Sequence, residues 1–126
     1  MTKLNANKRQ VFISYVTKSW IKKGRTLVGS GRYEEALQAY DRALELNPDA
    51  FVVWFNKGIA LADLGRNEEA LQAYEKALEL DPDDSDAWYY KGRTLKNLGR
   101  HGEALQACAK SLALNPEYSD TWCNEG

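Results

Sequence analysis

The sequence is poor in the residues that build metal centres and disulfide frameworks. Its 126 residues include two cysteines and one histidine, which are too few for a zinc site or a disulfide-stapled fold. No apolar run approaches the ~20 residues of a membrane-spanning helix, and the basic start lacks the apolar core and cleavage site of a signal peptide. With 44% hydrophobic and 28% charged residues, we expect a folded, cytoplasmic chain without metal or cofactor.

Acidic residues are absent from the first 33 positions, which carry eight Lys or Arg. Residues 34–84 hold thirteen acids against four bases, and residues 85–126 hold five of each, so the net charge of −1 conceals a basic end and an acidic middle. The basic end suits an acidic partner, nucleic acid, a second copy of the chain, or plain solvation. Nucleic acid is disfavoured because no reading motif or aromatic stacking platform accompanies the charges.

Signatures of catalysis are also missing. The sequence has no phosphate-binding GxxxxGK[ST], zinc-binding HExxH or dinucleotide-binding GxGxxG motif. His101 follows a turn glycine, with no nucleophile or carboxylate at a useful spacing. Cys108 falls on an apolar helical stripe, as a buried thiol does. The sequence therefore predicts that the protein is not an enzyme.

What the sequence does contain is a repeat of 34 residues. Three units occupy 17–50, 51–84 and 85–118, and "SDTWCNEG" at 119–126 begins a fourth. A period of this length indicates stacked supersecondary units. The repeated structural positions are Trp20, Gly24, Ala36, Tyr40, Pro48, Trp54, Gly58, Ala70, Tyr74, Pro82, Trp88, Gly92, Ala104 and Pro116.

The residue pattern of each unit predicts a pair of antiparallel helices. In the second unit, apolar residues from Trp54 onward follow helical spacing until Gly65, which can adopt a left-handed conformation after a helix. A second stripe begins at Ala70 and ends before Pro82, which cannot continue a helix. Small residues such as Gly58 would lie where the two helices cross. One pair cannot bury both of its faces, so neighbouring units must stack.

The pattern W-x3-G, A-x3-Y-x2-A and a closing Pro at this period resembles the tetratricopeptide repeat (TPR) family. The resemblance implies an all-α fold, a right-handed α-solenoid of three helix-turn-helix units plus a C-terminal partial repeat. It also implies a non-catalytic scaffold that binds a peptide or a partner helix, and the basic residues suggest acidic flanks on that partner. The sequence departs from the family at Lys23, Lys57 and Lys91, where Leu is usual, and at Cys108, where the other units have Tyr. We expect the lysine stems to lie along apolar surface with their ammonium groups in water, and looser packing around Cys108.

The resemblance further implies a concave groove lined by the first helix of each unit. By the family's geometry the groove positions are the second, fifth, ninth, twelfth and thirteenth of each unit. An alternative is that Phe55 and Ile59 only pack against neighbouring helices. The carboxylate clamp of TPR co-chaperones matches this sequence only at Asn56, although Arg25, Arg93 and Lys96 could form a cruder anion site. The candidate groove residues are Lys18, Ile21, Arg25, Val28, Gly29, Val52, Phe55, Asn56, Ile59, Ala62, Asp63, Asp86, Tyr89, Arg93, Lys96 and Asn97.

The two ends of the chain suggest self-association. Counting back from Trp20, Val16, Ile13 and Phe12 share its helical stripe, so residues 1–16 are expected to be a basic extension that lengthens the first helix from about Gln10. The partial repeat is too short to cover the third unit, and bare apolar surface of that kind is often an interface. The alternatives are a monomer with a frayed end and a scaffold fragment of a larger protein. The residues expected to mediate self-association are Val11, Phe12, Ile13, Leu105, Cys108, Leu112 and Trp122.

Overall fold

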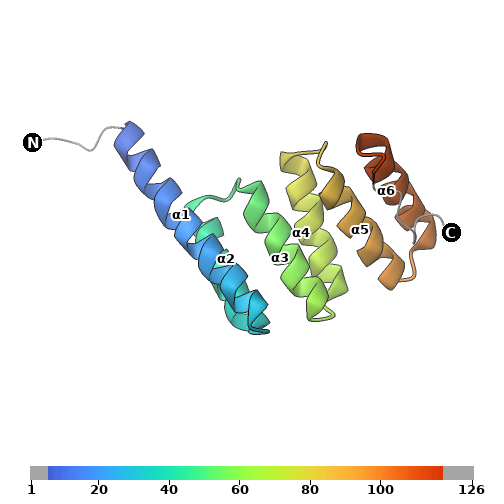
Figure 1. Ribbon diagram of the computed structural model, residues 1–126, viewed down its shortest axis with the longest axis horizontal. Coiled ribbons are helices and arrows are strands. Elements are labelled where there is room, and N and C mark those ends of the chain that lie inside the picture. Colours follow the sequence, from blue (N-terminus) through green and yellow to red (C-terminus); the bar gives the residue numbers. More distant parts are fainter. Residues whose placement is uncertain (1–5, 118–126) are drawn as a thin grey trace, which may run out of the picture.

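The computed structural model describes residues 6–117, which form six α-helices and no strand (Figure 1). The whole partial repeat at 119–126, with Trp122, and residues 1–5 of the extension lie outside this range. No helix of the described chain is long and apolar enough to cross a membrane. The helices are α1 (Ala6–Gly29), α2 (Tyr33–Leu46), α3 (Phe51–Asp63), α4 (Asn67–Leu80), α5 (Ser85–Asn97) and α6 (His101–Leu114).

The helices pack as three pairs that stand in a row along the long axis of the molecule (Figure 1). Within a pair, α1 packs on α2, α3 on α4 and α5 on α6. Between pairs, α2 packs against α3 and α4 against α5, and α3 also contacts α1 and α5. Each pair contacts only its neighbours, which is the arrangement of a solenoid. The predicted all-α helical-repeat solenoid is therefore confirmed.

Glycines with positive φ close the turn inside each pair, at Gly31, Gly65 and Gly99. In the second unit φ of Gly65 is 79°, and the N–H of the next residue, Arg66, donates to the Leu61 carbonyl at 2.9 Å. This bond belongs to a helix-ending motif that needs a left-handed residue, and glycine adopts that conformation without a Cβ clash.

A second set of glycines lets the paired helices approach closely. Gly58 on α3 is buried beneath the ring of Tyr74 on α4, and a Cβ at Gly58 would lie 2.5 Å from that ring. Gly24 has the same relation to Tyr40 in the first pair. The crossing of each of these helix pairs therefore depends on a missing side chain.

In the second and third units, a tryptophan and a lysine contact the preceding unit. The Trp54 indole N–H donates to the Pro48 carbonyl at 2.8 Å. The Lys57 ammonium lies 2.9 Å from the Asp41 carboxylate on α2 and 5.4 Å from the centroid of the Trp54 ring. The lysine therefore lies along the Trp54 ring as expected, and its ammonium group also faces an acid of α2 that is itself largely exposed. Lys91 repeats the contact with α4.

Two other expectations about single residues need correction. Cys108 is buried, as expected, but it is disulfide-bonded instead of being a free thiol. In α1, which begins at Ala6 and not near Gln10, Ile13 and Val16 are half-buried whereas Phe12 is 66% exposed. Phe12 extends beyond the part of α1 that α2 covers, so it does not share the buried stripe.

Candidate ligand groove

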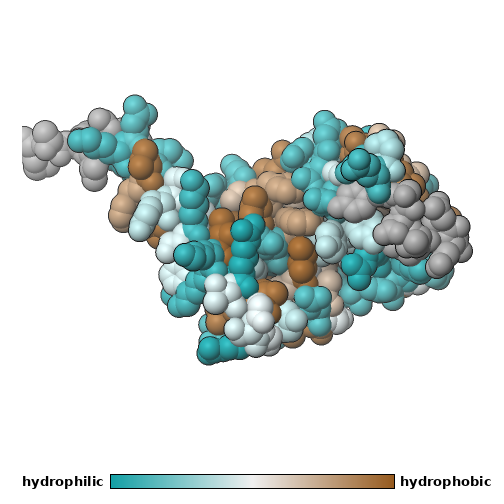
Figure 2. All heavy atoms as spheres, in the orientation of Figure 1, coloured by the Kyte–Doolittle hydropathy of each residue, from teal (hydrophilic) through white to brown (hydrophobic). Residues whose placement is uncertain are grey.

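The first helices of the three pairs, α1, α3 and α5, lie next to one another, with α3 in contact with both others. Figure 2 shows hydrophobic residues gathered over the middle of the molecule, around α3, with hydrophilic residues to either side. This row of first helices is the candidate groove.

An aromatic cluster joins three helices at the middle of the groove. The ring centroids of Phe55 on α3 and Tyr90 on α5 are 5.4 Å apart, nearly perpendicular to each other. Tyr74 on α4 lies 6.0 Å from Phe55 and 6.1 Å from Tyr90. Phe55 is half-buried and packs against neighbouring helices, as the alternative interpretation of this residue expects. Such ring pairs stabilise the junction of α3 and α5.

A cavity of about 80 Å³ lies beside this cluster, between α3 and α5. The repeat register selected five of its lining residues from sequence, namely Ile59, Ala62, Asp63, Arg93 and Asn97. It missed the others because their repeat positions were assigned to the core or to no role. Those missed residues are Tyr74, Tyr90 and Thr94.

The Tyr74 hydroxyl is the unusual polar group of this cavity. It is fully buried and has no hydrogen-bond partner among the described residues. Burial is the main cause that raises the pKa of Tyr74 above its usual value; Tyr90 and the charge of Asp63 raise this pKa further, and Arg93 opposes them. The hydroxyl is therefore protonated near neutral pH and available as a donor.

The guanidinium group of Arg93 lies over the Tyr90 ring, 5.7 Å from its centroid. Its side chain is exposed, and it forms no ion pair with any residue in the range 6–117. The cation–π contact positions the charge at the cavity without neutralising it. Arg93 is therefore free to bind an external acceptor.

The other predicted groove residues are spread along the row of helices. Arg25 is exposed on α1, and its charge partly offsets the burial that raises the pKa of Tyr40. Neither Arg25 nor Lys96 lines the cavity that contains Arg93, so these three cations do not share one site there. Asn56 on α3 has a buried amide nitrogen without a partner in the described chain. Lys18 lines a separate cavity on α1.

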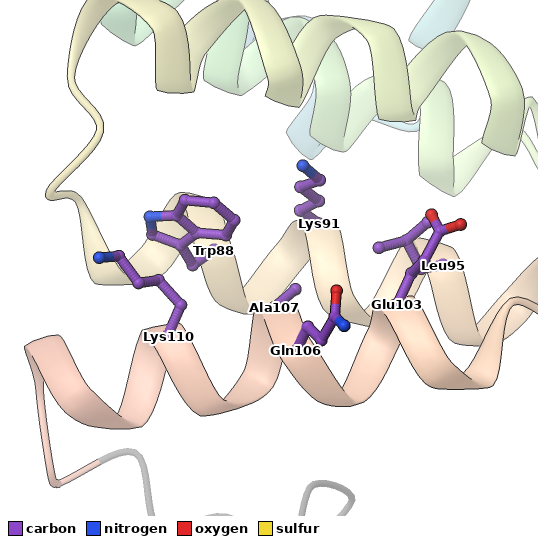
Figure 3. A pocket seen from close by; sticks show the side chains of 7 residues that line it. All are labelled: Trp88, Lys91, Leu95, Glu103, Gln106, Ala107 and Lys110. Atoms are coloured by element: carbon purple, nitrogen blue, oxygen red, sulfur yellow. The ribbon is translucent and has the colours of Figure 1, made fainter.

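A wider cavity of about 390 Å³ lies between α5 and α6 (Figure 3). Figure 3 shows Trp88 and Leu95 of α5 facing Gln106 and Lys110 of α6. The same repeat positions of the first unit line a cavity of about 240 Å³. Because equivalent positions of two units line the two cavities, these cavities follow from how the helices of those pairs pack and do not define a dedicated site.

The residues predicted for self-association divide into two groups. Val11 and Phe12 on α1 and Leu105 on α6 are exposed, whereas Ile13 and Leu112 are half-buried and Cys108 is buried. In Figure 2 a second hydrophobic cluster lies over the N-terminal half of α1. In residues 6–117, no three His, Cys, Asp or Glu side chains are grouped so that they could hold a metal ion.

The stacked helix pairs and their groove define a helical-repeat scaffold. The tetratricopeptide repeat family matches residues 21–85 and 55–119, so the chain belongs to this family. Proteins of the family are generally non-catalytic scaffolds for protein interactions. The comparison with curated proteins returned no match.

Solved structures support the same assignment. The second TPR of Spaghetti (RPAP3), bound to the HSP90 peptide SRMEEVD, superposes with a TM-score of 0.77 at 26% identity, covering 79% of this chain and 93% of that one. A point mutant of MamA gives a TM-score of 0.73 at 32% identity, covering 79% and 72%. YrrB, described as a TPR protein with an unusual peptide-binding site, gives 0.76 at 29% identity, covering 81% and 53%.

Proposed function

We propose that this protein is a non-catalytic interaction module whose groove along α1, α3 and α5 binds a peptide or a helix of another protein. The observation that carries the proposal is the junction of α3 and α5. There, the rings of Tyr74 and Tyr90 line a cavity beside the exposed guanidinium group of Arg93, which forms no ion pair with the described residues. Apolar surface with a few directed polar groups is typical of binding sites.

The chemistry of the groove favours a partner with acidic residues. Arg25 and Arg93 occupy the same position of their units, and both side chains are exposed. Guanidinium groups suit carboxylates because their donors form a planar fork. The peptide bound to the RPAP3 domain, SRMEEVD, carries acidic side chains, which supports an acidic ligand for a similar fold.

A selection from a phage-displayed library of random short peptides tests this function. We expect selected peptides to be rich in acidic and apolar residues and to bind the full chain with micromolar affinity. The double variant Arg25→Glu, Arg93→Glu should lose this binding. The variant Arg42→Glu, Lys76→Glu makes the same charge change on α2 and α4 and should keep it. Peptides that bind both variants as tightly as the wild type would place the site outside the groove.

A second candidate function, self-association through α1, is favoured by one observation. Val11, Phe12 and Tyr15 are 66–73% exposed on the part of α1 that extends beyond α2 (Figure 1). Large side chains exposed together often mark an interface. Light scattering at micromolar concentration should give a mass above the monomer for wild type and the monomer mass for Val11→Glu, Phe12→Glu. A monomeric wild type excludes this function.

A further inference from the structure

The first helices α3 and α5 each have one side that the second helix of the preceding unit covers. On α3 this side carries Val53, Lys57 and Ala60. Val53 and Ala60 are fully buried and belong to one core cluster with residues of α2, and the Lys57 ammonium group lies 2.9 Å from the Asp41 carboxylate of α2. α5 receives α4 in the same way, through a second pair of a lysine and an acid. The protein therefore shows twice which kind of helix fits this side.

The same side of α1 is open. The residues of the first unit that correspond to Val53, Lys57 and Ala60 are Ser19, Lys23 and Thr26, and all three are exposed. Within residues 6–117, α1 contacts only α2 and α3, and its pair stands at one end of the row (Figure 1).

The exposed ring of Phe12 lies on this side too, about three helical turns before Lys23. Phe12, Ser19, Lys23 and Thr26 together form the open side of α1.

Lys23 is held in the same arrangement as the lysines that pair with acids. Its ammonium group lies 5.2 Å from the centroid of the Trp20 ring, and Lys57 and Lys91 lie 5.4 and 5.0 Å from the tryptophan rings of their own helices. Lys23, however, forms no ion pair with any residue of the described chain. The ring positions the charge without neutralising it, so a carboxylate on a docked helix would complete the arrangement.

The shape and charge of the open side suit an acidic helix. Ser19 and Thr26 have small side chains, which allow another helix to approach closely. The Thr26 hydroxyl already donates to the Lys22 carbonyl at 2.9 Å, so covering it leaves no donor without a partner. Residues 1–33 contain no acid, and an acidic helix would therefore meet no repelling side chain on α1.

A second copy of the chain does not offer the required acid. In head-to-tail stacking, α6 of one copy would lie on α1 of the next. The position of α6 that corresponds to Asp41 of α2 and Glu75 of α4 is Ala109. α6 therefore has no carboxylate where the other two second helices place theirs, and a helix of a different protein fits better.

We propose that the open side of α1 is a docking surface for an acidic amphipathic helix of another protein. This helix lies on α1 as α2 lies on α3, places a carboxylate opposite Lys23 and extends along α1 to cover Phe12. The surface is separate from the groove, because it is the side of α1 that corresponds to the α2-facing side of α3. Its occupation does not depend on a ligand in the groove.

The chain itself supplies a probe for this surface. A hydrocarbon-stapled peptide with the sequence of α2, residues 33–46, presents the acid in a helix, whereas an unstapled helix of this length is marginal in water. Titration into the isotopically labelled full chain, followed by NMR, should shift the Trp20 indole signal and the backbone signals around Lys23. The same peptide with Asp41→Asn should bind about 2–5-fold more weakly, as expected for the loss of a partly exposed ion pair.

A charge reversal tests the pairing directly. Lys23→Glu should weaken binding of the α2 peptide, and the peptide with Asp41→Lys should bind Lys23→Glu more tightly than it binds wild type. Lys22→Glu is the control, because it makes the same charge change on α1 about 100° away around the helix, and it should bind the α2 peptide more tightly than Lys23→Glu does. Absence of binding, or equal affinity of wild type and Lys23→Glu for the α2 peptide, overturns the proposal.

The contribution of Phe12 needs a longer probe. Because α2 leads directly into α3, the C-terminus of α2 lies beside the start of α3, and a helix docked in the same way would reach Phe12 with its C-terminal end. Lengthening the α2 peptide there by about two turns, with leucines facing α1, should increase its affinity. Phe12→Ser should remove only this gain. A longer peptide that gains nothing, or keeps its gain in Phe12→Ser, contradicts the proposed placement.

The remaining outcomes identify another occupant or another site. A peptide with the α6 sequence and Cys108→Ser that binds as tightly as the α2 peptide points to a second copy and overturns the proposal. A mass above the monomer in light scattering of wild type, lowered by Phe12→Ser, does the same. The double variant Arg25→Glu, Arg93→Glu separates this surface from the groove. If that variant loses the α2 peptide, the acidic helix binds in the groove, so this proposal fails and the groove function gains support.

Discussion

Single residues with no side chain decide how closely the helices of a pair approach. Gly58 is buried against the Tyr74 ring, and Tyr74 in turn lines the cavity between α3 and α5. A residue that permits packing within one unit therefore also positions a ring that lines the cavity between two units.

Replacement of Gly58 by alanine should destabilise the protein. The added Cβ would lie 2.5 Å from the Tyr74 ring, which must move within a packed core, at a cost of about 1–3 kcal/mol. Chemical denaturation measures the change in the free energy of unfolding. Gly102→Ala is the control, because a Cβ there meets nothing within 4 Å and alanine favours a helix. Equal stability of Gly58→Ala and wild type would contradict the crossing geometry.

Buried tyrosines should make stability fall at high pH. Burial is the main cause that raises the pKa of Tyr40 and Tyr74 in the folded state, whereas unfolded tyrosines ionise near pH ~10. Above that pH the unfolded state binds fewer protons than the folded state, so the free energy of unfolding falls as pH rises, by up to ~1.4 kcal/mol per pH unit and residue. The contribution is fully present below pH ~10.

Denaturation curves at about pH 9 and about pH 11, on either side of the usual tyrosine pKa, measure this dependence. Tyr74→Phe should reduce the loss, because one of the two buried groups no longer titrates. Tyr15→Phe is the control, since Tyr15 is 73% exposed. The same loss in Tyr74→Phe and wild type would show that Tyr74 ionises normally in the folded protein.

At the scale of helices, charged contacts join each unit to the one before it. Lys57 on α3 pairs with Asp41 on α2, and Lys91 on α5 pairs with Glu75 on α4. In both cases the lysine also lies over the tryptophan of its own helix. Each lysine therefore combines a cation–π contact with an ion pair across the repeat boundary, where the family usually has a leucine.

A double-mutant cycle on Lys57→Ala and Asp41→Ala should detect this coupling. The two atoms are 2.9 Å apart and Asp41 is largely exposed, so we expect a coupling of about 0.5–1 kcal/mol that decreases with salt. The pair Arg42 and Glu45 on α2 is the control, because both side chains are more than 60% exposed at 3.5 Å. Equal coupling free energies in the two cycles would mean that the Lys57–Asp41 pair stabilises the repeat boundary no more than an ordinary surface ion pair does.

At the scale of the whole molecule, stability should be graded along the row of helices. The central helices α3 and α4 are covered by neighbours on both sides. The N-terminal half of α1 extends beyond α2 (Figure 1). In a solenoid each unit gains stability from its interfaces, so units with one neighbour open more readily.

Amide hydrogen exchange measures this gradient. We expect the slowest exchange in α3 and α4 and the fastest in α1 before Thr17, where side chains are mostly exposed. Within α1, the part from Thr17 onward that packs on α2 provides an internal comparison. If the start of α1 is protected as strongly as α3, another molecule covers it, and self-association through α1 gains support.

The sequence by itself determined the fold class and the places of the turns. The 34-residue period, the helical stripes and the glycines at Gly31, Gly65 and Gly99 are local patterns, and local backbone chemistry translates them directly into helices and turns. The candidate groove residues came from the geometry of the family that the repeat resembles, applied in the register of each unit. That register selects positions by their place in a unit, and their membership of a ligand site stays a prediction.

Only the tertiary structure decided which side chains from different units meet. The partner of Lys57 lies in the preceding unit, and Tyr74, which the repeat pattern marked as a core residue, also lines a cavity with Tyr90 and Arg93 of the next unit. These contacts join residues far apart in sequence, and the angle at which the pairs stack sets their distances. A periodic pattern repeats the same information in every unit, so it cannot indicate the one junction where a buried hydroxyl and a guanidinium group come together.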